Sequence, residues 1–421
     1  ANSDAGNTGT VEFDGSNTSV ITGATTFYNL TIDTPGKLVR FTDSQTQTVS
    51  GTLRAVGQSG NRVQLRSNNP GTTWTLDNAG NTENVEYATI EDSAVLSNDI
   101  TANFSIDAGN NDVTPPGWLF SGSAWTWVGG TSSDWGDQTN WDSGDGTPGD
   151  DGTPGVTDSV TIPDVANDPQ LTALSGAVSI ADLTIFSGAE LDLNSYDLTV
   201  SGSLTNVGTI RAEGGETVTA TLNTDSGLVI YDGTGPFASL PFGNDYFELT
   251  ISLAGSSISP SGAMTVASDL TVTSGEFDLN AQTLDVTGDW TVAGGATFTS
   301  GAGTVTFDSP FGTQTITTGG SDAAHDFDDV VINVGGTALL AGDFAITGVG
   351  TLSVSSGTLE TGAFDISVAG DATITGVLDA SGQTGAETAV FSGNLGGGGS
   401  ADFGAGPVSV VGNVSIDTFA A

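Results

Sequence analysis

The stretch Ser274–Trp290 reads SGEFDLNAQTLDVTGDW, and two other stretches repeat its pattern. Ser187–Leu204 reads SGAELDLNSYDLTVSGSL, and Ser356–Ala372 reads SGTLETGAFDISVAGDA. The copies recur at intervals of roughly 85 residues through the C-terminal two-thirds of the chain. In each copy apolar and polar residues alternate in short runs that end at Gly, Asn or Asp, which is typical of strand, turn and strand. Because such a unit cannot bury its apolar face alone, the repeat predicts an all-β parallel β-helix, a β-solenoid.

Short strand-like segments separated by turns continue along the rest of the chain, and no stretch combines helical periodicity with helix caps. The expected strands include Thr10–Phe13, Asn29–Ile32, Arg62–Leu65, Thr73–Leu76, Val85–Ile90, Val160–Ile162, Leu183–Ile185, Leu228–Tyr231, Phe247–Ile251, Val330–Val334 and Val408–Val411. Inward asparagines such as Asn194 and Asn280 are expected to stack inside the solenoid.

Two sections joined by a Trp-rich segment are predicted. Pro115-Pro116-Gly117 cannot continue a strand ladder, so a boundary is expected near residue 120. Five of the seven Trp follow within Trp118–Trp141, before the acidic Gly/Pro loop Asp142–Gly155. We expect an N-terminal β-solenoid section over residues 1–120, a Trp-rich junction with its acidic loop over 121–157, and a C-terminal β-solenoid with the supra-repeats over 158–421.

Charge is unevenly distributed along the 421 residues, whose formal net charge is −44. The first 66 residues hold five basic and five acidic residues, and Arg211 is the only Lys or Arg after them. This balance disfavours nucleic acid and anionic membranes, which require Lys and Arg. No apolar run reaches the ~20 residues of a membrane-spanning helix, so no membrane insertion is expected. The absence of Cys excludes disulfides and thiol-bound metals.

The ends of the chain predict self-assembly. The motif GTVxFD occurs at Gly9–Asp14 and again at Gly303–Asp308. When the C-terminal Gly412–Ala421 is placed before the N-terminus, the two rebuild one copy of Gly288–Asp308, so the chain is expected to begin and end within a repeat. We therefore expect head-to-tail pairing of edge coils. The residues assigned to this interface are Val410, Val414 and Ile416, with Arg54, Arg62 and Arg66 setting the register against acidic surface.

Two readings of the acidic surface stay open. Most acidic residues are expected at solvated outward positions. Alternatively, the loop holding Asp142, Asp145, Asp150 and Asp151 offers hard oxygen ligands that suit calcium, although its spacing matches neither an EF-hand nor a calcium-binding β-roll. Apart from this calcium, no cofactor is expected.

No catalytic residue is assigned, and the chain is not expected to be an enzyme. Catalysis on a polysaccharide would need acidic pairs accompanied by a basic partner. The pairs Asp150-Asp151 and Asp328-Asp329 have no basic residue nearby in sequence, and His325, the only histidine, is expected in a solvated loop.

The Trp cluster also has two readings, a hydrophobic plug over the end of a solenoid section or a surface that stacks on sugar rings. The recurring Thr-x-Thr pattern is expected to mark outward positions of strands, because its middle residue is mostly apolar. Its spacing is also too irregular for a flat ice-binding face.

The repeats and the Trp-rich junction resemble large bacterial surface β-helix proteins, namely filamentous haemagglutinin-like adhesins and autotransporter passenger domains. The matching residues are Trp127, Gly129, Trp135, Asn140, Trp141, Pro154, Asp158, Val160 and Ile162. The resemblance implies a secreted or cell-surface structural protein, a subunit of a fibre, stalk or sheath. The alternative is an adhesin segment that binds a glycan or receptor on its outer face.

Overall fold

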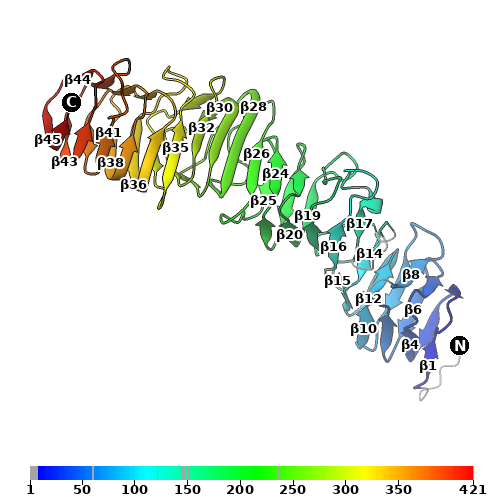
Figure 1. The fold of residues 1–421 in the computed structure, drawn as a ribbon. Helices are drawn as coiled ribbons and strands as arrows, with labels where there is room; N and C mark the ends of the chain where they lie inside the picture. The colour runs from blue at the N-terminus through cyan, green and yellow to red at the C-terminus, as the bar shows by residue number, and fades with distance from the viewer. Residues whose placement is uncertain are drawn as a thin grey trace. The chain divides into compact units, whose positions relative to one another are not determined.

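The computed structural model describes residues 8–58, 61–120, 122–143, 148–149, 152–235 and 237–420 (Figure 1). Within these residues the only helix is one 3-10 turn, η1 (Gln138–Asn140), and none is long and apolar enough to cross a membrane. Strands from successive coils pair in parallel and in register, as where Thr10 pairs with Asn29 and Leu30 with Leu53. The predicted all-β parallel β-solenoid is confirmed.

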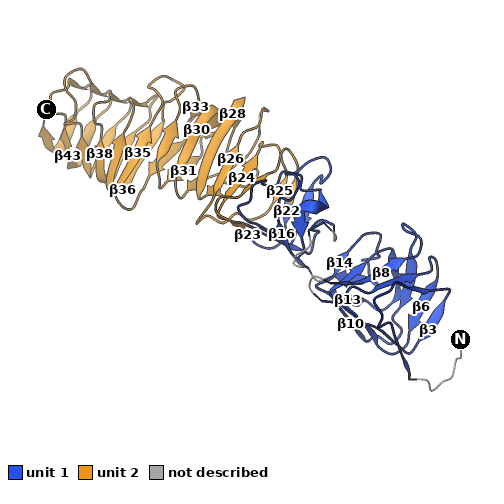
Figure 2. Cartoon of the chain, turned by 45° about the vertical axis from the view of Figure 1, so that its right-hand side comes forward, with its two compact units in different colours: residues 1–184, 199–203 blue, residues 185–198, 204–421 orange. Residues whose placement is uncertain are grey.

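The chain forms two compact units (Figure 2). Unit 1 holds residues 1–184 and 199–203, and unit 2 holds residues 185–198 and 204–421. The expected boundaries at residues 120 and 157 both fall inside unit 1, and the division into three sections stays a prediction.

The first coils of unit 1 have three sides, each a parallel sheet. The first sheet contains β1 (Thr10–Glu12), β4 (Asn29–Ile32), β7 (Leu53–Val56), β10 (Glu83–Glu86), β13 (Ile100–Asn103) and β15 (Trp118–Phe120). The second contains β2 (Ser19–Ile21), β5 (Leu38–Phe41), β8 (Val63–Ser67), β11 (Ala88–Ile90) and β14 (Ile106–Asp107). The third contains β3 (Thr25–Phe27), β6 (Thr46–Val49), β9 (Trp74–Asp77) and β12 (Ser93–Ser97).

Alternate residues of these strands point into one core, which extends from Ile21 to Trp118. Inside it the rings of Phe41 and Trp74, from neighbouring sides, stack with centroids 3.8 Å apart. The expected strand Val85–Ile90 is divided into β10 and β11, because Tyr87 adopts a φ of +47° and turns the chain from one side to the next.

The rest of unit 1 begins with the Trp-rich segment. β16 (Ala124–Trp127) pairs in antiparallel fashion with β17 (Trp141–Asp142) and in parallel with β18 (Ser159–Ile162). β19 (Val178–Ile180) follows in unit 1, and β20 (Asp182–Ile185) and β22 (Leu198–Val200) contain residues of both units. β23 (Leu204–Asn206) and β25 (Val218–Thr219) belong to unit 2.

Unit 2 also has three sides, which we call faces A, B and C. Face A contains β27 (Asp245–Tyr246), β29 (Met264–Val266), β31 (Thr283–Val286), β34 (Thr304–Phe307), β40 (Ala372–Ile374) and the first parts of β36 (Asp329–Leu340), β38 (Leu352–Glu360), β43 (Leu395–Asp402) and β45 (Val414–Ala420). Face B contains β21 (Glu190–Asp192), β24 (Thr209–Ala212), β26 (Leu228–Tyr231), the first parts of β28 (Glu248–Ile258) and β30 (Leu270–Asp278), β32 (Trp290–Val292), β35 (Thr313–Thr317), β41 (Val377–Asp379) and the second parts of β36, β38, β43 and β45. Face C contains the second parts of β28 and β30, then β33 (Thr297–Thr299), β37 (Phe344–Ile346), β39 (Ile366–Val368), β42 (Ala389–Phe391) and β44 (Val408–Val410).

The repeated phrase forms the same strand and turn in each copy but does not keep to one face. Leu191 in the first copy and Leu359 in the third lie on face B, whereas Phe277 in the second lies on face C and pairs with Phe298. Leu191, Phe277 and Leu359 are all fully buried. The phrase therefore specifies a corner with two buried strands, and the faces it joins differ between copies.

Candidate functional site

β45 is an edge strand of unit 2 that carries apolar side chains. It pairs with β43 on one side, and no strand in the described residues pairs with its other side. Val414 and Phe419 are 49% and 43% exposed, whereas Leu395, which pairs with Val414 from the preceding coil, is fully buried. Ile416 and, on the edge strand β44, Val410 are half-buried. The three apolar residues predicted for assembly thus lie on the edge strands of unit 2.

β1 is an edge strand of unit 1. Among the described residues it pairs with β4 alone. Val11 is 43% exposed and Phe13 is half-buried, although Leu30, which pairs with Val11, is 1% exposed. In the second GTVxFD motif the equivalent residues Val305 and Phe307 are fully buried between β31 and β36. β1 therefore has the sequence of an inner strand, but its apolar side chains are exposed as on an edge strand.

The three arginines predicted to set the register between molecules contact other coils of unit 1. Their partners are the Asp33 carboxylate for Arg54 at 3.2 Å, the Glu91 carboxylate for Arg66 at 3.1 Å, and the carbonyl oxygens of Phe104 and Ser143 for Arg62. Arg62 is only 6% exposed. Each guanidinium thus has an acceptor within its own chain, and a contact with a second molecule stays a prediction.

Arg211 joins three coils of face B. Its guanidinium lies 3.1 Å from the carboxylate of Glu190 on the preceding coil and 2.9 Å from that of Asp232 after the following strand. The hydrogen bond to Glu190 is the main reason that the pKa of Arg211 is raised above its usual value. The only Lys or Arg after residue 66 therefore links neighbouring coils.

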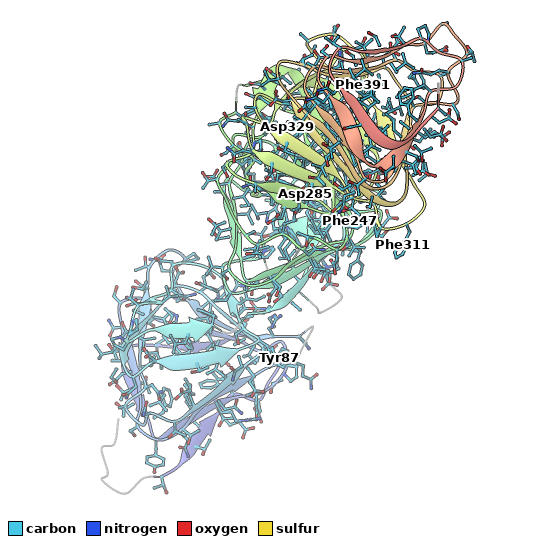
Figure 3. All side chains as sticks on the ribbon, turned by 90° about the vertical axis from the view of Figure 1, so that its left-hand side faces the viewer. Tyr87, Phe247, Asp285, Phe311, Asp329 and Phe391 are labelled. Atoms are coloured by element: carbon cyan, nitrogen blue, oxygen red, sulfur yellow. The ribbon has the colours of Figure 1, made fainter. Side chains whose placement is uncertain are left out.

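Asp and Asn side chains that precede or begin strands hydrogen-bond one coil to the next, and we call them the Asx ladder. Asp371 Oδ1 accepts the backbone N–H of Asn394 at 2.8 Å, and Asn394 Oδ1 accepts that of Asn413 at 2.9 Å. The same contact in unit 2 joins Asn244 to Ser261, Asp269 to Asp289, Asp289 to Thr315, Asp329 to Thr351 and Asp343 to Asp365 (Asp329 is labelled in Figure 3). These side chains satisfy backbone donors between coils, a role beyond the solvated outward positions expected from the sequence.

The sequence holds a signal for this ladder that apolar alternation alone does not reveal. An Asx residue directly precedes an apolar–polar–apolar strand, as in GDWTV (Gly288–Val292), GDATI (Gly370–Ile374) and GNVSI (Gly412–Ile416). In unit 1 the carboxylate of Asp182 accepts the backbone N–H of Ser203 in the same way, and this hydrogen bond lowers the pKa of Asp182.

The predicted inward stack of Asn194 and Asn280 is wrong. Their φ angles are +46° and +51°, and their side chains are half-buried and exposed, respectively. The third copy has Gly362, with a φ of +57°, at the same place. Asn and Gly are the residues that adopt this left-handed conformation at least cost, so the asparagines are selected by the corner and not by the core.

The five tryptophans of the junction are core residues, with exposures between 0% and 2%: Trp118, Trp125, Trp127, Trp135 and Trp141. Trp118 belongs to the core of the first coils, whereas the ring of Trp141 packs edge-on against the other three. Rings buried to this extent cannot stack on a sugar. The plug interpretation agrees with their burial, and β16, which carries Trp125 and Trp127, covers β18.

The expectation of a solvated His325 is also wrong. Its side chain is 5% exposed, its Nδ1 lies 2.7 Å from Asp322 Oδ1, and Gly319 and Gly320 leave room for the ring. A backbone hydrogen bond from Phe298 N–H to the carbonyl of Ala324 joins this segment to the neighbouring coil. The loop is therefore part of the stack.

The predicted calcium loop is only partly described. Asp145, Asp150 and Asp151 lie outside the described residues, and Asp142 ends β17. Within the described ranges no three His, Cys, Asp or Glu side chains are grouped as metal ligands. The calcium site stays a prediction.

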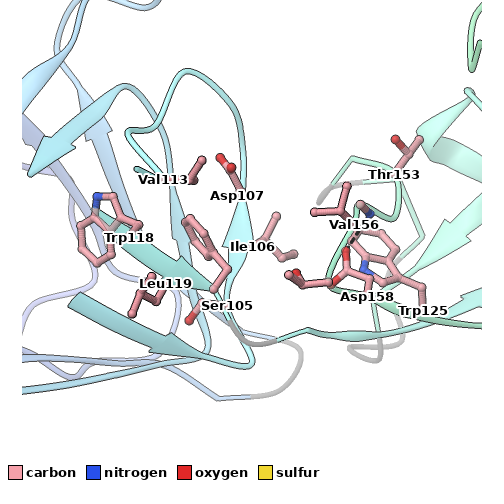
Figure 4. Close-up of a pocket in the computed structure, with 13 residues that line it drawn as sticks. Ser105, Ile106, Asp107, Val113, Trp118, Leu119, Trp125, Thr153, Val156 and Asp158 are labelled. Atoms are coloured by element: carbon pink, nitrogen blue, oxygen red, sulfur yellow. Dashed lines mark hydrogen bonds between the residues drawn. The ribbon is translucent and has the colours of Figure 1, made fainter. Parts of the chain in front are cut away.

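Unit 1 contains an apolar cavity of about 490 Å³ (Figure 4). Trp118, Leu119 and Ile106 line one side, and Trp125 and Val156 line the other. The half-buried Asp158 in its lining has its pKa raised by partial burial, but its oxygens accept backbone N–H groups of Ser123 at 2.7 Å and Gly155 at 2.8 Å. Both oxygens of that carboxylate thus accept hydrogen bonds from the protein backbone.

Comparison of the chain with protein-family models, with curated proteins and with solved structures found no match. The resemblance to bacterial surface adhesins and passenger domains stays a prediction, and the geometry of the edge strands is what bears on function.

Proposed function

We propose that the protein is an extracellular structural β-solenoid, a subunit of a surface fibre, stalk or sheath that assembles head to tail through its edge coils. The observation that carries the proposal is the exposure of apolar side chains on strands whose inner equivalents are buried. Val414 and Val11 are 49% and 43% exposed at positions where Leu395 and Val305 are fully buried.

Edge strands of this kind favour pairing with another chain. β1 and β45 each leave a row of backbone donors and acceptors without a strand partner among the described residues. Proteins that remain monomeric usually protect such edges with Pro, Lys or bulges. The side chains of β45 include Val, Ile and Phe, which favour burial by a further coil.

The charge distribution supports contact between unlike ends of two molecules. The first 66 residues have equal numbers of acidic and basic residues, whereas the rest carry the net charge of −44. Placing the neutral end on the acidic end costs less repulsion than placing two acidic surfaces side by side. The acidic, Cys-free composition is consistent with the proposed extracellular location, and no catalytic role is part of the proposal.

The test compares the wild-type chain with Val414→Asp and Val349→Asp. Val349 is 86% exposed in a turn, so its variant matches the change of side chain away from the edge strands. Light scattering over a range of protein concentrations should show assembly of the wild type and of Val349→Asp. Val414→Asp should remain monomeric with an unchanged unfolding temperature, and negative-stain images of the wild type should show fibres of uniform width. A wild-type chain that stays monomeric at every concentration contradicts the proposal.

A second candidate function is glycan adhesion through the outer surface, which one aromatic pair favours. The rings of Tyr87 and Phe104 stack with centroids 5.3 Å apart, and Phe104 is 51% exposed (Tyr87 is labelled in Figure 3). An exposed aromatic face suits the apolar face of a sugar ring. Glycan-array binding that is lost in Phe104→Ser would support this function, and wild-type chains that bind no glycan would exclude it.

A further inference from the structure

Two pairs of strands share both sequence and register. In unit 1 the motif GTVEFD places Thr10 and Val11 of β1 opposite Asn29 and Leu30 of β4. In unit 2 the motif GTVTFD places Thr304 and Val305 of β34 opposite Asp329 and Val330 of β36. The Asx residue of the second strand then accepts a backbone N–H from the next coil in both units, from Thr52 and from Thr351, respectively. β1 is therefore equivalent to a strand of face A.

The neighbours of β34 show what β1 lacks. On its other side β34 pairs with β31, so that Val305 and Phe307 lie opposite Leu284 and Val286. All four side chains are fully buried. β1 needs an equivalent of β31 to bury Val11 and Phe13.

The edge strand of face A in unit 2 provides this equivalent. In the first part of β45, Val414 and Ile416 alternate with the exposed Ser415 and continue the inward column of face A. We propose that β1 of a second copy of this chain pairs in parallel with the first part of β45, with Val11 opposite Val414 and Phe13 opposite Ile416. This register rests on the proposed head-to-tail assembly and specifies its contact.

The Asx ladder is compatible with this register. Asn413 is the last described member of the column in which Asp371 and Asn394 each accept a backbone N–H from the following coil. With Val11 opposite Val414, the residue opposite Asn413 is Thr10. Asn413 Oδ1 then accepts the backbone N–H of Thr10 in the second copy. The polar ladder thus continues in the alignment that the apolar alternation indicates.

Disulfide trapping between two different variants tests the register. The chain has no Cys, and Glu12 and Ser415 are exposed residues that the proposed alignment places directly opposite each other. Adjacent strands lie about 4.8 Å apart, which is within the span of a disulfide. Glu12→Cys is mixed with a size-tagged Ser415→Cys and oxidised mildly. We expect a heterodimer that reductant reverses, and each variant alone should not reproduce that band.

An off-register control uses Ser409→Cys, which is exposed on the edge strand β44 of face C. Glu12→Cys mixed with Ser409→Cys should give at most a small fraction of the heterodimer formed with Ser415→Cys. If this control pair is trapped preferentially, or if the wild-type chain assembles by light scattering while neither pair is trapped, the register is overturned and the assembly stands. If the wild-type chain stays monomeric, the register and the proposed function fail together.

Discussion

Ala281 follows Asn280 in the corner of the second repeat and has a φ of +58°. A residue with a Cβ pays roughly 1–2 kcal/mol in this left-handed conformation, whereas Gly does not. The exposed Ala363 holds the same place in the third repeat, yet its φ is not positive. The two alanines therefore differ in backbone strain but not in exposure, because Ala281 is exposed too.

Ala281→Gly should stabilise the protein by about 0.5–1 kcal/mol, since relief of the strain exceeds the entropy that Gly adds to the unfolded chain. Ala363→Gly, which relieves no strain, should destabilise it by a similar amount. Urea unfolding of both variants measures the difference. Equal effects of the two substitutions would contradict the assigned role of the left-handed corner.

At the scale of the strand, the Asx ladder predicts that the acceptor and not the charge holds neighbouring coils. Asp371→Ala removes the acceptor for the backbone N–H and the side-chain amide of Asn394. It should cost about 1 kcal/mol of stability and speed hydrogen exchange at the Asn394 amide. Asp371→Asn keeps an acceptor oxygen and should leave both quantities close to wild type. Loss of protection in Asp371→Asn as large as in Asp371→Ala would show that charge dominates.

Many strands could be predicted from sequence because burial alternates along them, as in Leu198–Val200 or Thr304–Phe307. Which face each strand occupies could not, because Leu191 and Phe277 have the same local sequence on different faces. The face that a strand occupies depends on how many strands precede it in the solenoid, and the local sequence does not contain that number. The inward position predicted for Asn194 is wrong for a related reason, since a turn and an inward stack both use Asn and only the backbone angle separates them.

At the scale of the whole molecule, the charge of −44 makes stability depend on pH. Burial, with nearby carboxylates, raises the pKa of Glu248, Asp308 and Asp328 above their usual values. A raised pKa in the folded state means that the ionised group opposes folding at neutral pH, and this cost is lost as the pH falls through the folded pKa. Groups with a lowered pKa, such as Asp182, act in the opposite sense and lose their stabilisation only at lower pH.

The unfolding temperature should therefore rise as the pH falls from 7 towards about 4.5, and fall again below roughly pH 4, near the unfolded pKa of carboxyl groups. Glu248→Gln should be more stable than the wild type at pH 7 and equal to it near pH 4. Thermal unfolding across this range measures both effects. A wild-type unfolding temperature that falls steadily from pH 7 would contradict the assignment of the raised pKa values.

The part of the candidate site that could be predicted from sequence is the part that follows from the alternation of apolar and polar residues. By their sequence pattern Val414 and Ile416 are inward residues of a strand, and the structure places them on an edge strand. The internal partners of Arg54 and Arg66 could not be predicted, because Asp33 and Glu91 are brought to them only by the winding of the coil. Long-range contacts of this kind depend on the number of residues in each coil.

The change of face between copies of the repeated phrase bears on how such a protein can lengthen. A duplicated segment would not need to contain a whole number of coils, because the same stretch of about seventeen residues can form a corner starting from more than one face of the solenoid. Another β-solenoid with three faces should tolerate insertion of this repeated segment at any of its faces. The unit that gene duplication copies is then one corner with its two flanking strands, which is smaller than one complete coil.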